Sequence, residues 1–201
     1  VAVLSLALTP LLAQIAAWAG TRQQAPPRGA APGGVAAPSG EAAPGGAAPL
    51  SGHVIIVGYG VNGRNLARVL REVGVPYRVL EVDPALVQRA RAEGQPIRFG
   101  DASRYEGLAA CGLKEAAVVV LAISDPAATR VAVSLTRAAN PGAYVIARTR
   151  LVSEVAELKR LGADEVIPEE FETSIAIFTR VLRRFHVPGN VVRLQEQALR
   201  L

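Results

Sequence analysis

The sequence G-Y-G-V-N-G at residues 58–63 constrains this chain more than any other feature. It contains Gly58, Gly60 and Gly63, and it follows a run at 54–57 in which every side chain is apolar and β-branched. Such a run is typical of a strand that is buried on both faces. Apolar residues then recur at helical spacing over 62–73. A G-x-G-x-x-G alone is a weak signal, but between a buried strand and a helix it predicts a nucleotide-binding turn.

A second predicted strand supplies an acid at the expected distance. The apolar run at 77–83 contains Glu81, about 20 residues beyond the glycines. In a unit of this kind, Gly58 permits the tight turn, Gly60 lets the backbone approach a pyrophosphate, and Gly63 lets the helix pack closely on the strand. The helix N-terminus attracts phosphate, and Glu81 would accept hydrogen bonds from a ribose. The alternative is a similar fold whose glycines serve packing alone.

Strand and helix patterns alternate through the remainder of the chain. Further strands are expected at 96–101, 116–124, 143–149 and 163–168. The helices between them are expected at 83–94, 103–113, 125–140 and 151–162, two of them opened by Asp-Pro. Two more helices are expected at 169–189 and 190–201. This alternation predicts an α/β fold, a Rossmann-like doubly wound parallel sheet of about six strands with helices on both faces.

The first 50 residues have two different compositions. Residues 1–20 carry no charge and are long enough to cross a bilayer, with Trp18 near the end and Arg22 just beyond it. Residues 21–50 are rich in Ala, Pro and Gly and cannot bury enough apolar surface to fold. A signal peptide would need a basic start, and a buried amphipathic helix would need a polar face. We therefore expect four parts: the end of a transmembrane helix at 1–20, a linker at 21–50, a nucleotide-binding domain at 51–168 and dimerisation helices at 169–201.

Composition argues against several other classes of protein. The net charge is +5, but the basic residues are scattered among acids without a Lys/Arg run, so no nucleic-acid partner is expected. A single cysteine, Cys111, excludes an internal disulfide and a cysteine-based zinc site. His53 and His186 lie near no second metal-ligand candidate, so no metal site is expected. Because the chain starts at Val1 and has no methionine, we expect it to be part of a larger protein.

Several segments together point to a known family. They are HVIIVGYGVNGR, VLEVDP, the triplet Gly100-Asp101-Ala102 followed by Ser103, VLAISDP and VIARTR. With these segments the chain, from residue 53 to about 187, resembles the regulatory nucleotide-binding domains of potassium transport proteins, called RCK, KTN or TrkA-N domains. The G-D-A-S segment is the most discriminating, since ordinary dehydrogenases do not usually carry it. The apolar start, the linker and the segment FHVPGNVVRLQEQ resemble the Kef-type branch of monovalent cation/proton antiporters.

The resemblance implies an adenine nucleotide, NAD(H) or AMP/ADP, and a set of contacts with it. The glycines would surround the phosphates, Glu81 would hold the ribose, and Asp101 would lie at the adenine. The residues expected to bind the nucleotide are Gly58, Tyr59, Gly60, Val61, Asn62, Gly63, Arg64, Glu81, Val82, Asp83, Gly100, Asp101, Ala102, Ser124, Asp125 and Arg148. Other interpretations exist for some of them. Asp83 and Asp125 would also serve as helix caps, and Arg148 could pair with a nearby Glu.

Three functions are compatible with these features of the sequence. The first is a cytoplasmic regulatory domain, without enzyme activity, that gates an attached potassium or monovalent cation/proton antiporter in the inner cell membrane, with residues 21–201 in the cytoplasm. The second is the same module in a potassium channel or a Trk-type uptake system. The third is an NAD-dependent oxidoreductase, which would need a substrate domain and an acid/base residue near the nicotinamide. Only residues 169–201 follow the last predicted strand, and His186 is their one candidate.

A homodimer is also expected, built partly by the helix at 169–186. Its apolar positions exceed what one side of a surface helix needs, and such exposed patches usually mark interfaces. These positions are Phe171, Ile175, Phe178 and Leu182, with Ile177 and Val181 beside them. In the resembling family, this helix crosses to a partner domain. The alternative is a helix that folds back on its own sheet.

Overall fold

A computed structural model of the chain describes residues 50–200. The transmembrane segment expected at 1–20 and the linker expected at 21–50, apart from its last residue, lie outside the described residues. Within 50–200, no helix is both long enough and apolar enough to cross a bilayer.

Six parallel strands form one sheet in the order β3-β2-β1-β4-β5-β6. The strands are β1 Val54–Val57, β2 Tyr77–Glu81, β3 Ile97–Phe99, β4 Val118–Leu121, β5 Tyr144–Thr149 and β6 Glu165–Pro168. The central strand β1 pairs with both β2 and β4, so that Ile56 lies between Val79 and Val120. Neighbouring parallel strands need crossover connections, which here are helical. The predicted Rossmann-like sheet is confirmed.

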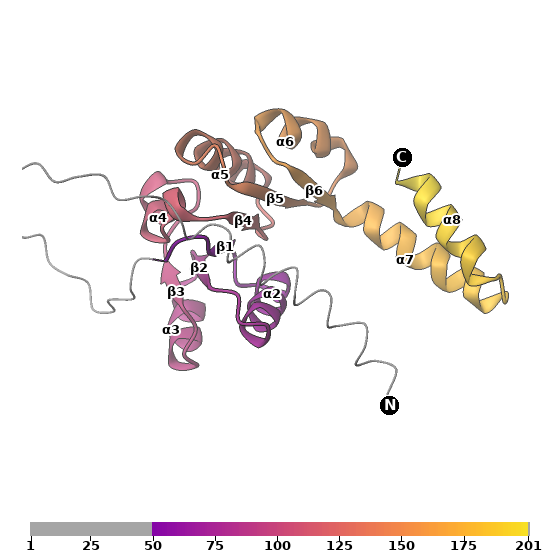
Figure 1. The fold of residues 1–201 in the computed structure, drawn as a ribbon, viewed down its shortest axis with the longest axis horizontal. Helices are drawn as coiled ribbons and strands as arrows, with labels where there is room; N and C mark the ends of the chain where they lie inside the picture. Colours follow the sequence, from indigo (N-terminus) through magenta and orange to yellow (C-terminus); the bar gives the residue numbers. More distant parts are fainter. Residues whose placement is uncertain (1–49, 201) are drawn as a thin grey trace, which may run out of the picture. The chain divides into compact units, whose positions relative to one another are not determined.

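Helices cover both faces of the sheet (Figure 1). They are α2 Val61–Glu72, α3 Pro84–Ala92, α4 Tyr105–Ala110, α5 Pro126–Ala139, α6 Val155–Leu161, α7 Glu169–Arg184 and α8 Gly189–Leu199, with short 3-10 turns at Leu113–Glu115 and Val152–Glu154. Helices α2 and α3 pack on one face, and α4, α5 and α6 on the other. Because side chains alternate along a strand, Val54 and Ile56 enter one core while Ile55 and Val57 enter the other.

Asp-Pro pairs begin two of these helices in the manner that the sequence predicted. The Asp83 carboxylate accepts hydrogen bonds from the Ala85 and Leu86 N–H groups, at 2.9 and 3.2 Å. The Asp125 carboxylate does the same at the start of α5, at 2.8 and 3.1 Å. Each proline follows its cap at the first helical position, where the missing N–H costs nothing.

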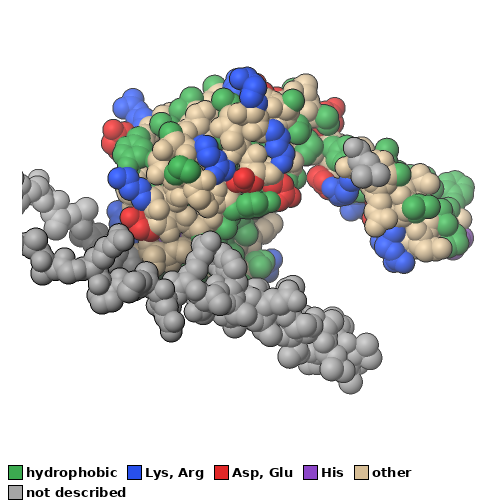
Figure 2. Space-filling view, turned by 45° about the horizontal axis from the view of Figure 1, so that its top comes forward, with side chains coloured by type: hydrophobic (Ala, Val, Ile, Leu, Met, Phe, Trp, Pro, Cys, Tyr) green, Lys and Arg blue, Asp and Glu red, His purple; other side chains and the backbone are tan. Residues whose placement is uncertain are grey.

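The last two helices form a hairpin. Helix α7 begins directly after β6, packs on β6 and α8, and does not fold back over the sheet as the alternative interpretation had it. Thr179 donates to Glu196 at 2.7 Å, and Arg200 contacts Glu172 with two hydrogen bonds of 2.6 and 2.8 Å. Figure 2 shows hydrophobic side chains exposed along this hairpin.

The apolar positions predicted on α7 divide into two groups. Ile175 is buried, and Phe171, Phe178 and Leu182 are half-buried. Ile177 and Val181 are 58% and 49% exposed, respectively. The hairpin therefore buries part of the apolar surface of α7 and leaves the remainder exposed to solvent.

A groove lies on the face of the sheet that α2 and α3 cover only in part. Its volume is about 570 Å³ and its floor is apolar, formed by Val120, Ile146 and Ile167 from β4, β5 and β6. Its rim comes from the first turns of α2 and α7. Val120 packs against the core beneath α2, whereas Ile146 is half-buried and Ile167 is 38% exposed.

The amino end of β1 holds a buried histidine and the single cysteine. His53 is fully buried and its Nε2 lies 2.7 Å from the Cys111 carbonyl oxygen. Burial lowers the pKa of His53, which keeps the ring neutral at pH 7. Cys111 is completely buried, and burial raises the pKa of its thiol to about 11. The thiolate is therefore essentially absent at physiological pH.

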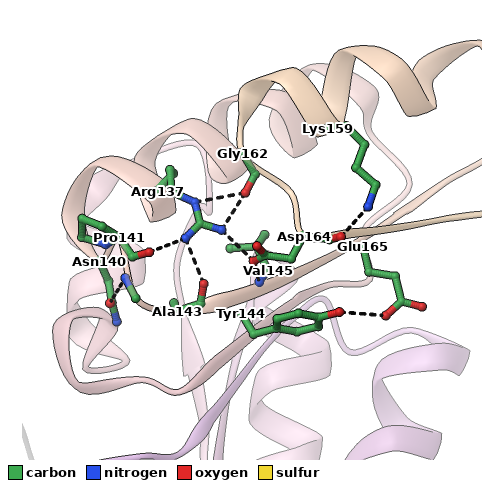
Figure 3. Close-up of polar contacts among 11 residues, drawn as sticks. Arg137, Asn140, Pro141, Ala143, Tyr144, Val145, Lys159, Gly162, Asp164 and Glu165 are labelled. Carbon is green, nitrogen blue, oxygen red and sulfur yellow. Dashed lines mark hydrogen bonds and ion pairs between the residues drawn. The ribbon is translucent and has the colours of Figure 1, made fainter.

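Arg137 ties together the elements at the β5–β6 edge of the sheet (Figure 3). From the end of α5, its guanidinium donates to the Gly162 carbonyl at the end of α6 at 2.7 and 3.1 Å. It also reaches the Pro141 and Ala143 carbonyls before β5, at 2.6 and 3.0 Å. A β-carbon at Gly162, whose φ is +112°, would lie 2.9 Å from Arg137 Cγ. Position 162 therefore requires glycine, because the Arg137 side chain packs directly against it.

Asp164 completes this network. Its carboxylate accepts from Arg137 at 2.6 Å and from the Val145 N–H at 2.7 Å. Partial burial acts to raise the pKa of Asp164, but these two hydrogen bonds and the charges of Arg137 and Lys159 lower it overall. Because the folded-state pKa is depressed, Asp164 stabilises the fold at neutral pH, and that contribution is lost as the pH falls through the lowered pKa.

We expect Arg137→Met to lower the free energy of unfolding by about 3 kcal/mol, because four carbonyl and carboxylate acceptors lose a charged donor. Urea denaturation of the chain measures this. Arg160→Met, at an exposed position on α6, is the matched control and should change stability by less than about 0.5 kcal/mol. Equal urea midpoints for the two variants would contradict a structural role for the network.

Candidate functional site

A cleft of about 480 Å³ opens at the carboxyl ends of the strands, where the sheet order changes direction between β1 and β4. This is the place where open α/β sheets bind their ligands. The lining residues are Val57, Gly58, Gly60, Leu80, Glu81, Val82, Gly100, Asp101, Ala102, Ser103, Ala122, Ile123, Ser124, Asp125 and Ala128. Nine of the sixteen residues that the sequence predicted for nucleotide binding lie in this set.

The three glycines of the loop differ in what they permit. Gly58 has a φ of +94°, and a β-carbon there would lie 2.9 Å from Ile123 Cγ2. A β-carbon at Gly63 would lie 1.9 Å from the Gly58 carbonyl oxygen, so α2 approaches the end of β1 at backbone contact. A β-carbon at Gly60 would meet nothing within 4 Å. Gly58 and Gly63 are therefore needed by the fold, whereas Gly60 borders open space in the cleft.

The N-terminus of α2 faces this space. Gly60 is its N-cap and offers no side chain to the free N–H groups, and the first turn contains no acid. The unsatisfied N–H groups and the helix dipole make such an end attractive to an anion. No Lys or Arg side chain lines the cleft in the described part of the chain, so phosphate charge would be met by backbone donors.

Glu81 connects the glycine loop to β2. One carboxylate oxygen accepts from the Tyr59 N–H at 2.6 Å, and the other accepts from the Val82 and Asp83 N–H groups at 2.8 and 2.9 Å. These three bonds fix the side chain at the cleft wall. An ionised carboxylate has about four acceptor sites, so Glu81 retains capacity for a ligand hydroxyl.

The loop after β3 forms the next wall. Asp101 accepts from the Ser103 N–H at 2.8 Å and from the Ser103 hydroxyl at 2.7 Å. These hydrogen bonds lower the pKa of Asp101, so its carboxylate is ionised at neutral pH. Gly107 of α4 packs against this loop, since a β-carbon there would lie 2.5 Å from the Asp101 carbonyl oxygen.

Several predicted residues lie outside the cleft lining. The Tyr59 side chain is buried in the α2–α3 core, while Val61 and Arg64 are exposed on α2. Asp83 caps α3, whereas Asp125 both caps α5 and lines the cleft. Gly63 is buried beneath the loop.

Asn62 and Arg148 lie on the rim of the groove above β4–β6 instead. Arg148 forms an ion pair with Glu169, the first residue of α7, as one interpretation of the sequence predicted. It also donates to the Ser124 hydroxyl at 3.0 Å. Arg148 therefore stands between the groove and the β4 wall of the cleft.

Sequence reasoning did not identify Ile123, Ala128, Ser103 or Gly107 as part of this site. Ser103 and Gly107 could have been found, because Ser103 directly follows the G-D-A triplet and Gly107 lies on the short helix α4, which packs against it. Ile123 and Ala128 carry no signal of their own. In the described part of the chain, no group of His, Cys, Asp or Glu residues is arranged to hold a metal ion.

Comparison with known proteins agrees with this geometry. Residues 54–169 match the TrkA-N domain family. The chain belongs to that family. This confirms the resemblance that the glycine turn and the G-D-A-S segment indicated.

Relatives of this TrkA-N domain are potassium efflux proteins. A putative K(+) efflux antiporter KefB from Alkalimonas amylolytica is 37% identical over 152 residues, which cover 75% of this chain and 23% of the relative. The glutathione-regulated potassium-efflux system protein KefC from Cronobacter sakazakii is 33% identical over 124 residues, covering 62% of this chain and 20% of KefC. The chain thus spans less than a quarter of the length of these relatives.

Solved structures show the same fold. The TrkA-N domain of inner membrane protein ybaL from Escherichia coli is 28% identical, with a TM-score of 0.63 over 65% of this chain and 97% of that one. The Shewanella denitrificans Kef CTD in AMP-bound form is 27% identical, with a TM-score of 0.60 over 73% of this chain and 87% of that one.

We expect substitutions at Gly63 and Gly60 to differ in their effect on the free energy of unfolding. Gly63→Ala should lower the free energy of unfolding by about 3 kcal/mol, because its β-carbon overlaps the Gly58 carbonyl oxygen. Gly60→Val should change it by less than about 1 kcal/mol, because the side chain enters open space. Thermal unfolding followed by circular dichroism tests both variants. A strongly destabilised Gly60→Val would show that the space at Gly60 is not open.

Proposed function

We propose that this TrkA-N domain binds an adenine nucleotide, NAD(H) or AMP/ADP, and regulates a monovalent cation/proton antiporter domain to which it is joined. The observation that carries the proposal is the uncapped N-terminus of α2 beside the open space at Gly60, within a cleft that Glu81 and Asp101 wall. A nucleotide site needs backbone donors for the phosphates, an acceptor for the ribose hydroxyls and a cleft that encloses the base.

Each part of the nucleotide has residues suited to it. The N–H groups at the start of α2 would hold the phosphates, and Glu81 would accept from the ribose hydroxyls. The base would lie between the walls at Gly100–Ala102 and Ile123–Ser124. The AMP-bound Kef CTD from Shewanella denitrificans supports this assignment.

A regulatory role is favoured over a catalytic one. The three acids of the cleft are engaged in structural bonds: Glu81 with the glycine loop, Asp101 with Ser103, and Asp125 with the start of α5. His186, the one acid/base candidate after β6, lies beyond the end of α7, remote in sequence and fold from the cleft lining. The relatives are transport proteins, which agrees with a regulatory module.

The transport context follows from the relatives. One is a putative K(+) efflux antiporter and the other a potassium-efflux system protein, so we propose an attached antiporter domain in the cell membrane, with residues 21–201 on its cytoplasmic side. A potassium channel is the second candidate, but the GsuK channel bound to NAD is 20% identical and supports the fold alone. A bound nucleotide can shift such a gate only by its difference in affinity for the two states.

We also propose that two copies associate through α7. Ile177 and Val181 leave an apolar strip open on α7, and the groove over β4–β6 leaves an apolar floor open on the sheet. The two surfaces suit each other, because burying both removes exposed apolar area. Helix α7 of one copy would then cross to the other.

Calorimetric titration of the chain with AMP, ADP, NAD and NADH tests the binding site. At least one of the four should bind, and Gly60→Val should weaken that binding at least tenfold because its side chain fills the space of the phosphate. In vesicles containing the full-length antiporter, the same variant should lose the response of cation/proton exchange to nucleotide. Absence of binding with all four ligands at millimolar concentration would contradict the proposal.

Sedimentation of the chain at micromolar concentration tests the dimer. We expect a dimer for the native chain and a shift toward monomer for the double variant Ile177→Ser and Val181→Ser, since both side chains are exposed within one copy. The matched control is Val69→Ser and Val73→Ser, at two valines on α2 and at its C-cap that are each 46% exposed. A native chain that sediments as a monomer would overturn the assembly.

A further inference from the structure

Glu169, the first residue of α7, lies beside two side chains from the nucleotide side of the domain. Its carboxylate pairs with Arg148 on β5, and Asn62 in the first turn of α2 lines the same groove beside it. The hydrogen bond from Arg148 is the largest cause that lowers the pKa of Glu169, and Asn62 and the charge of Arg150 act in the same direction. Glu169 is therefore a carboxylate anion whose ion pair is with Arg148.

Arg148 in turn holds the wall of the cleft. Its Nη1 lies 3.0 Å from the Ser124 hydroxyl and 3.4 and 3.3 Å from the carbonyl oxygens of Ala122 and Ile123. All three residues line the nucleotide cleft. One guanidinium thus fixes the β4 loop on one side and the start of α7 on the other.

Asn62 brings the phosphate end of the cleft into the same cluster. It is the second residue of α2, the helix whose N-terminus faces the open space at Gly60. A phosphate placed there brings negative charge to the first turn of α2, which borders the groove that Glu169 also lines. Like charges oppose each other, and Arg148 is the one cation that contacts both Glu169 and the cleft wall in the described part of the chain.

We infer that the cluster of Asn62, Arg148 and Glu169 couples phosphate binding in the cleft to the position of helix α7. The inference rests on the proposed nucleotide site. A bound phosphate draws Arg148 toward the cleft and repels Glu169, which loosens the first turn of α7 from β5 and α2. By linkage, the contact that holds α7 also opposes binding of the phosphate. Glu169 thereby lowers the affinity of the cleft for ligands that carry a phosphate and leaves the affinity for uncharged ligands unchanged.

The variant Glu169→Gln tests this, because it removes the charge and keeps the shape. AMP should bind Glu169→Gln about fivefold more tightly than the native chain, at the lower end of typical coupling. Adenosine, which has the same base and ribose without phosphate, should bind both equally. The matched control is Glu170→Gln, which makes the same charge change at an exposed neighbouring position, away from the Arg148 guanidinium, whose partners are Glu169 and the β4 loop. It should bind AMP as the native chain does.

Hydrogen–deuterium exchange gives a second readout on the helix itself. In the native chain, AMP should raise amide exchange in the first two turns of α7. In Glu169→Gln these amides should already exchange faster, and AMP should add little. If AMP leaves the exchange of α7 unchanged in the native chain, the coupling is overturned.

The outcomes separate this inference from the proposed function. A native chain that binds none of AMP, ADP, NAD or NADH overturns the nucleotide site and the coupling with it. A native chain that binds AMP, with Glu169→Gln equal to or weaker than it, overturns the coupling alone. Equal gains in Glu169→Gln and Glu170→Gln would show a general effect of net charge and would also overturn the role of the contact.

Discussion

The backbone contact between α2 and the end of β1 determines most of what this domain can do. Gly63 lies so close to the Gly58 carbonyl that no side chain fits between them. That approach seats α2 on the sheet, which closes the core around Ile56 and Ala67. It also points the start of the helix at the cleft. A single missing side chain therefore sets both the packing of one layer and the location of the anion-attracting end.

Polar contacts then fix the loops around that helix. Glu81 binds the glycine loop to the end of β2, Asp101 orders the loop after β3, and Arg148 orders the loop after β4. Each of these side chains is charged and each is used to shape a wall. The result is a site whose charged groups are largely committed to the protein, so a ligand meets backbone donors and a few remaining acceptor positions.

Local chemistry explains how much the sequence could predict. The glycine turn, the Asp-Pro caps and the β-branched strands act within a few residues, and from them the six strands and their succession along the chain were predicted correctly. Glu169 and Arg137 act on partners about twenty or more residues away. Nothing near them in the sequence indicates which carbonyl or carboxylate they will reach, because sheet order decides it. The hairpin of α7 and α8 was likewise predicted as two helices but not as a pair.

The state of the cysteine has a consequence for what the domain can sense. The sequence contains one cysteine and no methionine. Cys111 is sealed in the core, with its thiol pKa raised to about 11. Sulfur oxidation proceeds through exposed thiolates and thioethers, and this chain presents neither. Sulfur chemistry in this chain therefore offers an oxidant no exposed target, and a redox signal would reach the nucleotide cleft in the form of a bound ligand.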